Sequence, residues 1–510
     1  MATENRYDLW TEEEGLDEGV GLEMFSASDT PSMRLQAEHH HRHEFLADRL
    51  QAYSDAVFAI VGTILIVYIQ DTAIPKFEDH NKSLRQHVLD EVPLFSVYYF
   101  TFLHVSVIWF NHSRVFSVIE RVDYILIWMN MLLLYFVSFV PLTFGVLGEY
   151  NDTYAGIVIP SLKIVIINTT MAVIVWYVFR KKRLLPRDMT AQVAKYTRRA
   201  MYLKLLITPV FAILAIAFGK ISILASQIFF YSSIFVVLIP KGVVYIIDKR
   251  CNNHVSSLIV QIFSVTVSKE RIEFFTDGVY SIVATLVILD ITESGIPSRE
   301  MVDDEHGGDL FQALFAEKLK YSTYFTTFLV ISLLWIVHHS LFNFIKKLNP
   351  LMFLVHQCSL SFVGVVPAAI EVFADFFGSS NSDDEATAIQ IASLAIASVS
   401  LLQFVLLVLM YFADGDCVDK AIFHTKSSLH LLLKVITVPV TCLAAYWSSF
   451  GSTQSRHYVF YVLYLCVPLL LTVINIIMHS TALHFQCWNC CKRLKAVIGK
   501  QRNKTKYSLV

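Results

Sequence analysis

Long runs of apolar residues set the strongest limit on how this chain can fold. Ile125–Phe139 and Tyr458–Met478 contain no charged residue, and further apolar runs recur along the sequence. A helix of about 20 apolar residues crosses the hydrocarbon core of a bilayer. Lipid offers the backbone no hydrogen-bond partner, so such runs must pair their own N–H and C=O groups as helices. The pattern predicts an all-α polytopic membrane protein.

Composition agrees with this class. The chain is 55% hydrophobic and 16% charged, whereas a soluble domain carries about 25% charged residues. Length and hydropathy together predict about twelve membrane-spanning helices. The expected spans lie near 51–69, 95–117, 123–147, 157–179, 200–218, 222–246, 273–290, 319–343, 350–375, 387–412, 430–448 and 457–480.

The loop charges predict the orientation of these spans. Lys and Arg dominate the loop Arg180–Arg199, where Asp188 is the one acid, and Lys492–Lys506 contains no acid. Asp and Glu are concentrated in Glu293–Asp309 and Asp383–Glu385. Basic loops near spans stay in the cytosol, so the first pair is expected there and the second pair on the opposite side.

Both termini are then expected in the cytosol, because the predicted number of spans is even. Two N-x-[ST] sequons, at Asn81 and Asn151, fall in loops of the opposite side. Glycosylation of both asparagines is therefore predicted, since sequons in such loops are accessible to the modifying enzymes.

The two halves of the chain repeat one pattern. Matching segments occur in the same order and at nearly constant offsets of 222 to 226 residues, and an even number of spans lies in each half. This predicts two parallel six-helix repeats. The matches are Arg49–Ile60 with Arg271–Ile282, Trp109-x-x-His112 with Trp335-x-x-His338, and Val140-Pro141 with Val366-Pro367.

The repeats define five regions of the chain. They are a disordered cytosolic tail at 1–48, a first six-helix repeat at 49–248, a cytosolic linker at 249–270, a second repeat at 271–482 and a basic cytosolic tail at 483–510.

Ionisable residues inside the spans are candidates for function, because they are costly in a bilayer. Asp55 and Asp277 lie one turn into the first span of each half, and His112 and His338 lie one turn before the end of the second. Antiparallel spans bring each Asp and His to a similar depth. We expect a packed network of Asp, His and Trp (Trp109, Trp335) with Arg49 or Arg271. The alternative is a set of helix-end side chains that reach toward the interface.

The first span of each half carries an uncharged stripe. At about 100° per residue, Ile60, Thr63 and Val67 share one face, and Asp55 points about 140° away from Ile60. The second half repeats the stripe as Ile282, Thr285 and Leu289. From the pattern alone, the stripe faces lipid, a neighbouring helix or a pore.

Several function classes lack their signatures. The sequence contains no TVGYG-like filter, no span with arginine at every third position and no Walker A, HExxH, GxSxG or kinase motif. We therefore expect no enzyme activity, cofactor or nucleic-acid binding. Cys487, Cys490 and Cys491 follow the last span, and a zinc or redox site, S-acylation and a purely structural role all remain open.

These residues resemble the transmembrane protein 175 family, endolysosomal potassium channels without the usual filter loop. That family carries an Arg-x-x-x-Phe-Ser-Asp motif on the first span of each repeat. Here the copies read Arg49-x-x-x-Tyr53-Ser54-Asp55 and Arg271-x-x-x-Phe275-Thr276-Asp277, so that Tyr53 and Thr276 depart from it. The resemblance covers nearly the whole membrane region.

The resemblance implies a homodimer in which four helices surround one pore in the bilayer, namely the first helix of each repeat in both chains. It places the narrowest constriction at Ile60 and Ile282, the next at Val67 and Leu289, and lining threonines at Thr63 and Thr285. It also implies conduction of K⁺ and, from an acid lumen, of H⁺. The channel would lie in endosomal and lysosomal membranes, where it sets membrane potential and luminal pH.

A secondary transporter with two six-helix halves is the alternative, because many transporters share that layout. Two features favour the channel. The strongest charges of the first span lie near its end rather than at mid-span, and the Gly-x-x-x-Asp-Arg loop of such transporters is absent.

The last four residues, Tyr507 to Val510, fit a Tyr-x-x-apolar signal that adaptor proteins read on cytosolic tails. We expect lysosomal sorting through Tyr507 and Val510. Capture of the C-terminal carboxylate by a PDZ domain is the alternative.

Overall fold

The computed structural model describes residues 31–73, 83–237, 267–377, 381–419 and 426–452. Within these ranges the regular elements are helices, apart from one isolated bridge between Ile345 and Val418. Before residue 238 the chain forms α1 (Pro31–Thr63), α2 (Leu65–Ala73), α3 (Leu84–Asp90), α4 (Val92–Phe116), α5 (Tyr124–Ser138), α6 (Val140–Glu149), α7 (Tyr154–Arg180), η1 (Lys182–Leu184), α8 (Ala191–Phe218), α9 (Ile223–Ser232) and η2 (Ser233–Val237). After residue 266 it forms α12 (Lys269–Ser294), α13 (Arg299–His306), α14 (Leu310–Ala316), α15 (Lys318–Phe342), α16 (Pro350–Phe376), α17 (Ser382–Phe412) and α18 (Lys426–Ser448).

Ten predicted spans are confirmed as apolar helices long enough to cross a membrane. Of the other two, 222–246 is described only as far as residue 237, and 457–480 lies outside the described residues. The ten are Ala47–Ile69, Val92–Phe116, Tyr124–Glu149, Tyr154–Arg180, Ala191–Phe218, Lys269–Leu289, Lys320–Phe342, Pro350–Phe376, Ser382–Phe412 and Leu431–Ser448.

Polar caps set where several helices begin. Asp123 accepts a hydrogen bond from the N–H of Leu126 at the start of α5, and Thr190 accepts one from Val193 at the start of α8. Asn349 caps α16 in the same way. Such side chains satisfy backbone donors that the first helical turn leaves unpaired, so each helix starts directly after its cap.

The helix α1 differs from the predicted boundaries at both ends. It begins at Pro31, inside the segment predicted to be a disordered tail. Proline suits the first helical position, and the following residues are mostly good helix formers. At its other end a turn at Ile64 separates α1 from α2, although the N–H of Ile64 still bonds to the C=O of Ile60 at 2.9 Å. Val67 therefore lies on α2.

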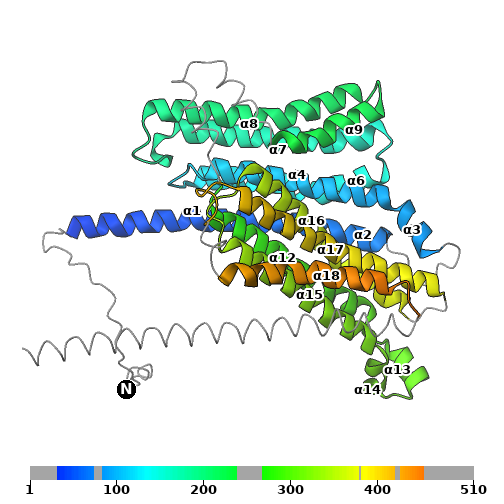
Figure 1. Cartoon of the computed structure of the whole chain (residues 1–510). Helices are drawn as coiled ribbons and strands as arrows, with labels where there is room; N and C mark the ends of the chain where they lie inside the picture. Colours follow the sequence, from blue (N-terminus) through cyan, green and yellow to red (C-terminus); the bar gives the residue numbers. More distant parts are fainter. Residues whose placement is uncertain (1–30, 74–82, 238–266, 378–380, 420–425, 453–510) are drawn as a thin grey trace, which may run out of the picture.

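The helices form three groups (Figure 1). Helices α7, α8 and α9 lie together on one side, α12, α15 and α18 lie on the other, and α1, α2 and α4 run between them. Contacts agree with this view, since α7 packs on α8, α16 packs on α17, and α1 packs on both α12 and α4. The first helix of one half thus lies directly against the first helix of the other.

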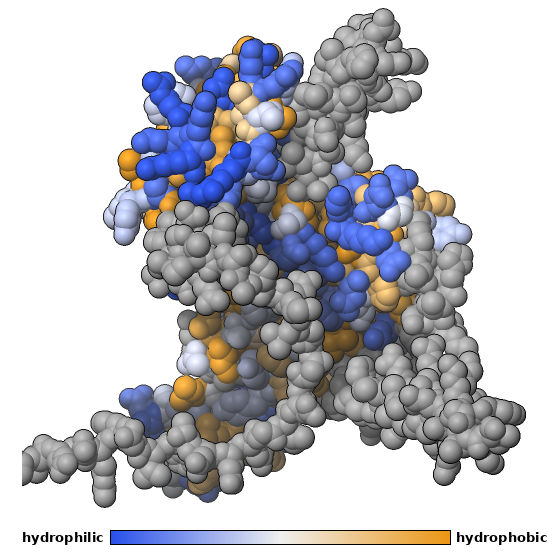
Figure 2. Space-filling view, turned by 90° about the vertical axis from the view of Figure 1, so that its left-hand side faces the viewer, coloured by the Kyte–Doolittle hydropathy of each residue, from blue (hydrophilic) through white to orange (hydrophobic). Residues whose placement is uncertain are grey.

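Charge is separated between the two ends of the bundle. Figure 2 faces the end where α7 is followed by α8, and its upper part is strongly hydrophilic. The basic residues of Arg180–Arg199 are largely exposed there. The acid-rich helix α13 lies at the opposite end (Figure 1).

Candidate ion pathway and its polar networks

A buried ion pair joins the two halves of the chain. The Asp55 carboxylate on α1 accepts hydrogen bonds from the Arg271 guanidinium on α12, with Nε to Oδ2 at 3.0 Å and a second bond from Nη2 to Oδ1. Trp109 Nε1 on α4 also donates to Asp55 Oδ1, at 2.7 Å. Asp55 is 2% exposed and Arg271 is 6% exposed. The carboxylate therefore holds three helices together.

Aromatic rings enclose this ion pair. The indole of Trp109 stacks on Phe275, with ring centroids 4.5 Å apart, and lies 6.1 Å from the ring of Phe353. All three side chains are almost completely buried. Water is thereby kept from the ion pair, which strengthens its electrostatic attraction.

A second, parallel network connects α1, α4 and α5. His112 Nε2 bonds to Asn130 Oδ1 at 2.9 Å, which requires the proton on Nε2. Asn130 Nδ2 donates to Ser54 Oγ at 3.0 Å, and Ser54 donates to the C=O of Leu50 at 2.8 Å. The donors therefore point in one direction, from the histidine to the backbone of α1.

The second half repeats these contacts with different residues. Trp335 Nε1 donates to Asp277 Oδ1 at 2.7 Å. Thr276 Oγ1 bonds to His356 Nε2 at 2.9 Å, and the ring of His356 stacks on that of His338 at 5.0 Å. The Asp–Trp bond thus occurs in both halves, and Thr276 stands in the place of Ser54.

The predicted network named Arg49 or Arg271 as its arginine, and in the structure Arg271 from the other half pairs with Asp55, because α12 lies directly against α1. The prediction is corrected for the histidines. The histidines do not bond to the aspartates. His112 bonds to Asn130, and His338 packs on His356, since the neighbouring tryptophan already occupies the carboxylate.

Sequence reasoning missed Asn130 and His356. They lie 226 residues apart, the same offset that relates Trp109 to Trp335. Applying this offset to the third span of each half would have identified them. Neither residue belongs to an obvious motif, and a single polar residue changes the mean hydropathy of a long apolar span only slightly.

Small residues set the crossing of α1 and α12. A Cβ atom added to Gly278 would lie 3.0 Å from the Cβ of Ala59. Small residues allow helix backbones to approach closely in a membrane protein. The close crossing brings Asp55, about one turn before Ala59, within reach of Arg271, about two turns before Gly278.

The stripe residues differ in exposure. Ile60 is 49% exposed and Leu289 is 47% exposed, whereas Val67 and Ile282 are half-buried. Thr63 is buried, unlike Ile60, although the helical spacing places the two on one face. It lies four residues after Ala59 and so belongs to the face that packs on α12. Its counterpart Thr285 is exposed.

Both threonine hydroxyls donate to their own helix. Thr63 Oγ1 bonds to the C=O of Ala59 and Ile60 at 2.9 and 3.0 Å. Thr285 Oγ1 bonds to the C=O of Ser281 and Ile282, both at 3.0 Å. The donors are therefore occupied, and the oxygen lone pairs stay available to accept.

The remaining candidate residues are only partly described. Asn151 is half-buried, its C=O accepts from Gln227 Nε2 at 2.8 Å, and Thr153 of its sequon caps α7. Its glycosylation stays a prediction. Asn81, Tyr507, Val510 and the three clustered cysteines lie outside the described residues. Within the described ranges, no three His, Cys, Asp or Glu side chains are grouped to hold a metal ion.

Comparison with known proteins places these motifs in one family. The sequence model of the family "Endosomal/lysosomal potassium channel TMEM175" matches the chain twice, at residues 49–141 and 271–367. These segments contain Arg49, Asp55 and Trp109, and Arg271, Asp277 and Trp335.

Individual relatives agree with the family match. The chain is 30% identical over 429 residues to the endosomal/lysosomal proton channel TMEM175 of Gallus gallus, covering 82% of this chain and 85% of the relative. It is 27% identical over 433 residues to the Homo sapiens protein of the same name, covering 83% and 84%. A potassium channel of Streptomyces collinus is 32% identical over 154 residues, which cover 29% of this chain and 73% of the relative. On this evidence, the chain belongs to the TMEM175 family of endosomal/lysosomal ion channels.

Proposed function

We propose that this protein is a channel for K⁺ and H⁺ in endosomal and lysosomal membranes, with a pore enclosed by α1 and α12 of two identical chains. The relatives from animals are named proton channels and those from bacteria potassium channels. Both permeant ions are therefore proposed for this chain, together with a role in setting membrane potential and luminal pH.

The observation that carries this proposal is the crossed ion pair. Arg271 from the second half bonds to Asp55 from the first half. The motif repeats at an offset of 222 residues, so the equivalent pair would join Arg49 to Asp277. Asp277 is exposed and makes no ion pair with any described residue. The arginine that completes its site would come from a second copy of the chain.

The exposed faces of the two helices support this arrangement. On α1, exposed residues recur at Arg49, Tyr53, Ala56 and Ile60, and on α12 at Phe274, Asp277, Ser281 and Thr285. Both stripes follow helical spacing. By the repeat offset, the exposed α12 stripe is equivalent to the α1 face that packs on α12 within the chain. In the proposed arrangement, α1 of a second copy packs on this stripe. Two copies would then close a ring of four helices with two-fold symmetry.

The two parallel repeats are part of the same proposal. Most of the Streptomyces collinus relative is matched by less than a third of this chain. The equivalent Asp–Trp hydrogen bonds in the two halves also support two repeats of one structural unit. In such a ring, each half of this chain would supply one of the four pore helices.

Apolar side chains form the proposed barrier inside the ring. Ile60 and Ile282 would make the narrowest level, with Val67 and Leu289 further along and the threonine oxygens of Thr63 and Thr285 nearby. An apolar constriction forces an ion to lose part of its hydration shell. K⁺ holds its water less tightly than Na⁺, so its barrier is lower.

Whole-endolysosome recording under asymmetric K⁺, Na⁺ and H⁺ tests this function. We expect a current whose reversal potential follows the K⁺ gradient at neutral luminal pH and shifts toward the H⁺ gradient as the lumen is acidified. A flux that saturates and reverses only with a coupled solute gradient would instead establish a transporter.

A further inference from the structure

A basic pocket lies where the loop between α7 and α8 meets the segment before α5. Its volume is about 590 Å³, within the usual range of about 300–1,000 Å³ for small-molecule sites. Two backbone bonds hold the segments together, from the N–H groups of Glu120 and Arg121 to the C=O of Leu184. Six cationic residues line it: Arg121, Lys182, Arg183, Arg187, Lys195 and Arg198.

One of these cations is already paired. Arg183 Nη2 lies 3.1 Å from Asp123 Oδ2, which also accepts from the hydroxyl of Tyr177 at 2.7 Å. The other five cations make no ion pair within the described part of the chain. The pocket therefore holds a surplus of positive charge that a ligand with several negative charges would neutralise.

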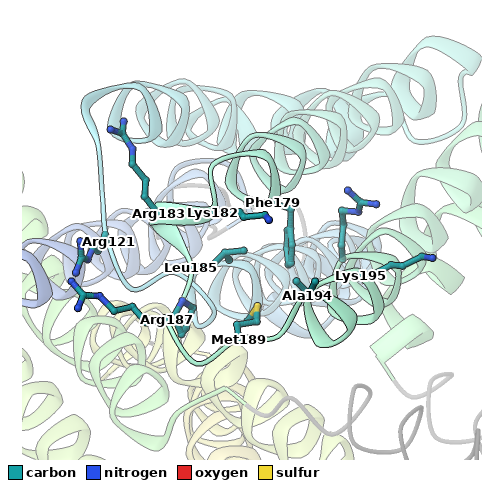
Figure 3. Close-up of a pocket in the computed structure, with 12 residues that line it drawn as sticks. Arg121, Phe179, Lys182, Arg183, Leu185, Arg187, Met189, Ala194 and Lys195 are labelled. Atoms are coloured by element: carbon teal, nitrogen blue, oxygen red, sulfur yellow. The ribbon is translucent and has the colours of Figure 1, made fainter.

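The pocket also has an apolar part. Figure 3 shows Phe179, Leu185 and Met189 lying between the basic side chains, with Arg121 and Arg187 on one side and Lys195 on the other. A site for a free inorganic anion has no need of such a surface. The apolar residues would suit a ligand that joins phosphate groups to a hydrocarbon portion.

Exposed aromatic residues place the pocket at the level of the membrane surface. Tyr124, Trp128 and Trp176 are 83%, 73% and 53% exposed. Tyrosine and tryptophan concentrate at the boundary between lipid headgroups and hydrocarbon. Arg121 lies three residues before Tyr124, and Lys182 lies six residues after Trp176. The basic side chains are therefore at headgroup depth.

We propose that this pocket binds the phosphorylated headgroup of an inositol phospholipid in the cytosolic leaflet. Only the cytosolic orientation, which rests on the loop charges, is carried over from the proposed channel. A headgroup with several phosphates offers partners to several cations, whereas phosphatidylserine carries one net negative charge. Lys and Arg form strong charge-assisted bonds with phosphate, and clustered basic residues beside a span attract anionic lipids.

The test is a binding measurement on the purified full-length protein in nanodiscs of phosphatidylcholine. Thermophoresis would compare dioctanoyl phosphatidylinositol bisphosphate, dioctanoyl phosphatidylserine and soluble inositol trisphosphate. We expect the phosphoinositide to bind at least about tenfold more tightly than the other two. Affinity of soluble inositol trisphosphate equal to that of the lipid would assign the pocket to a free phosphate ligand instead.

Adjacent residues provide a matched control. Lys182 and Arg198 line the pocket, whereas their neighbours Lys181 and Arg199 do not. Lys182→Ala with Arg198→Ala should weaken phosphoinositide binding by about tenfold or more, because two charge-assisted contacts are lost. Lys181→Ala with Arg199→Ala removes the same charge and should change affinity by less than about twofold.

The outcomes separate the pocket from a general effect of charge. Equal weakening by both double variants, or no binding to the unmodified protein, would overturn the pocket assignment. Should the first double variant fold poorly, Arg187→Ala tests the same site from an exposed loop position. A failure of lipid binding leaves the ion current untouched, so it is distinguishable from failure of the proposed channel.

Discussion

Asp55 and Asp277 occupy the same motif but have different surroundings. Both accept a hydrogen bond from a tryptophan at 2.7 Å. Asp55 is buried against Arg271, whereas Asp277 is exposed on α12. A buried ion pair adds little net stability compared with apolar residues, yet loss of one partner is costly because the other charge stays buried. Asp55, which neutralises Arg271, is thus expected to matter for folding more than for ion selectivity.

Asp55→Asn tests this expectation. The asparagine can still accept from Trp109, but Arg271 loses its counter-charge, so we expect destabilisation of about 3–5 kcal/mol. Tryptophan fluorescence during thermal unfolding in detergent would measure it. Trp109→Phe keeps the ion pair and should cost less, about 1–3 kcal/mol for the carboxylate oxygen left without that donor. A normal unfolding temperature with an altered reversal potential would place Asp55 on the ion path instead.

Ile60→Asn combined with Ile282→Asn tests the proposed constriction. A polar ring lowers the dehydration barrier most for the more strongly hydrated ion, so Na⁺ passage should rise relative to K⁺. The reversal potential between pure K⁺ and pure Na⁺ solutions measures the change. Leu203→Asn on α8 alters an equally exposed apolar residue outside the proposed pore and should leave the reversal potential unchanged. Identical selectivity in all three proteins would exclude this level as the filter.

At the scale of helices, hydropathy and length were sufficient to predict the ten spans that the structure describes, whereas breaks within the helices were not predictable. The dipeptides Val140-Pro141 and Val366-Pro367 are identical in sequence. The first starts α6 after a break at Phe139, whereas the second lies inside the continuous helix α16. Proline is compatible with both a first-turn position and a kinked helix interior, so the dipeptide alone does not distinguish these outcomes.

The candidate site was predictable to a similar extent. Motif repetition identified Asp55, Trp109 and Arg271 as a group, because charges in a span stand out. The choice of Arg271 over Arg49 depends on which helices lie side by side, and a single repeat does not contain that information. The role of Asn130 depends on contacts between three helices in the same way.

Asp123 links three segments at the basic end of the bundle and allows a test at this scale. It caps α5 and accepts from Tyr177 and Arg183. Burial opposes its ionisation, but the bonds from Leu126, Tyr177 and Arg183 outweigh burial and hold its pKa below the usual value. Asp123→Ala should destabilise the protein by about 1–2 kcal/mol. Asp123→Asn keeps a capping oxygen and should cost less than about 1 kcal/mol.

The pH dependence of this difference follows from the lowered pKa. A carboxyl with a lowered folded-state pKa stabilises the fold above its unfolded pKa, about 3.9, and loses this contribution as pH falls through the folded value. The stability difference between the natural protein and Asp123→Asn should therefore stay constant from about pH 5 to pH 8. Denaturant unfolding at several pH values measures it, and a decline already at pH 6 would contradict the assigned contacts.

At the scale of the whole molecule, the contact between α1 and α12 within one chain predicts the contact between chains. Ala59 packs against Gly278 in the structure. Shifted by the repeat offset of 222 residues, these positions become Ser281 and Ala56. Both equivalents are exposed in the single chain. If two copies close a ring of four helices, Ala56 of one copy must therefore approach Ser281 of the other.

Cysteine cross-linking tests this ring directly. Disulfides need Cβ atoms about 3.5–4.5 Å apart. A Cβ added to Gly278 would lie 3.0 Å from that of Ala59, so a shift of a few tenths of an ångström brings this pair into range, and we expect the same of the equivalent pair. We would co-express an Ala56→Cys chain and a Ser281→Cys chain with different tags and oxidise the membranes. A reducible band near twice 58.1 kDa that carries both tags is expected.

Each variant expressed alone controls for the natural cysteines. Ala59→Cys with Gly278→Cys in one chain should cross-link without any increase in mass. If the ring were built from different helix faces, the internal cross-link would still form, but the two tagged chains would remain monomers. That outcome would also remove Arg49 of the second copy as the proposed partner of Asp277.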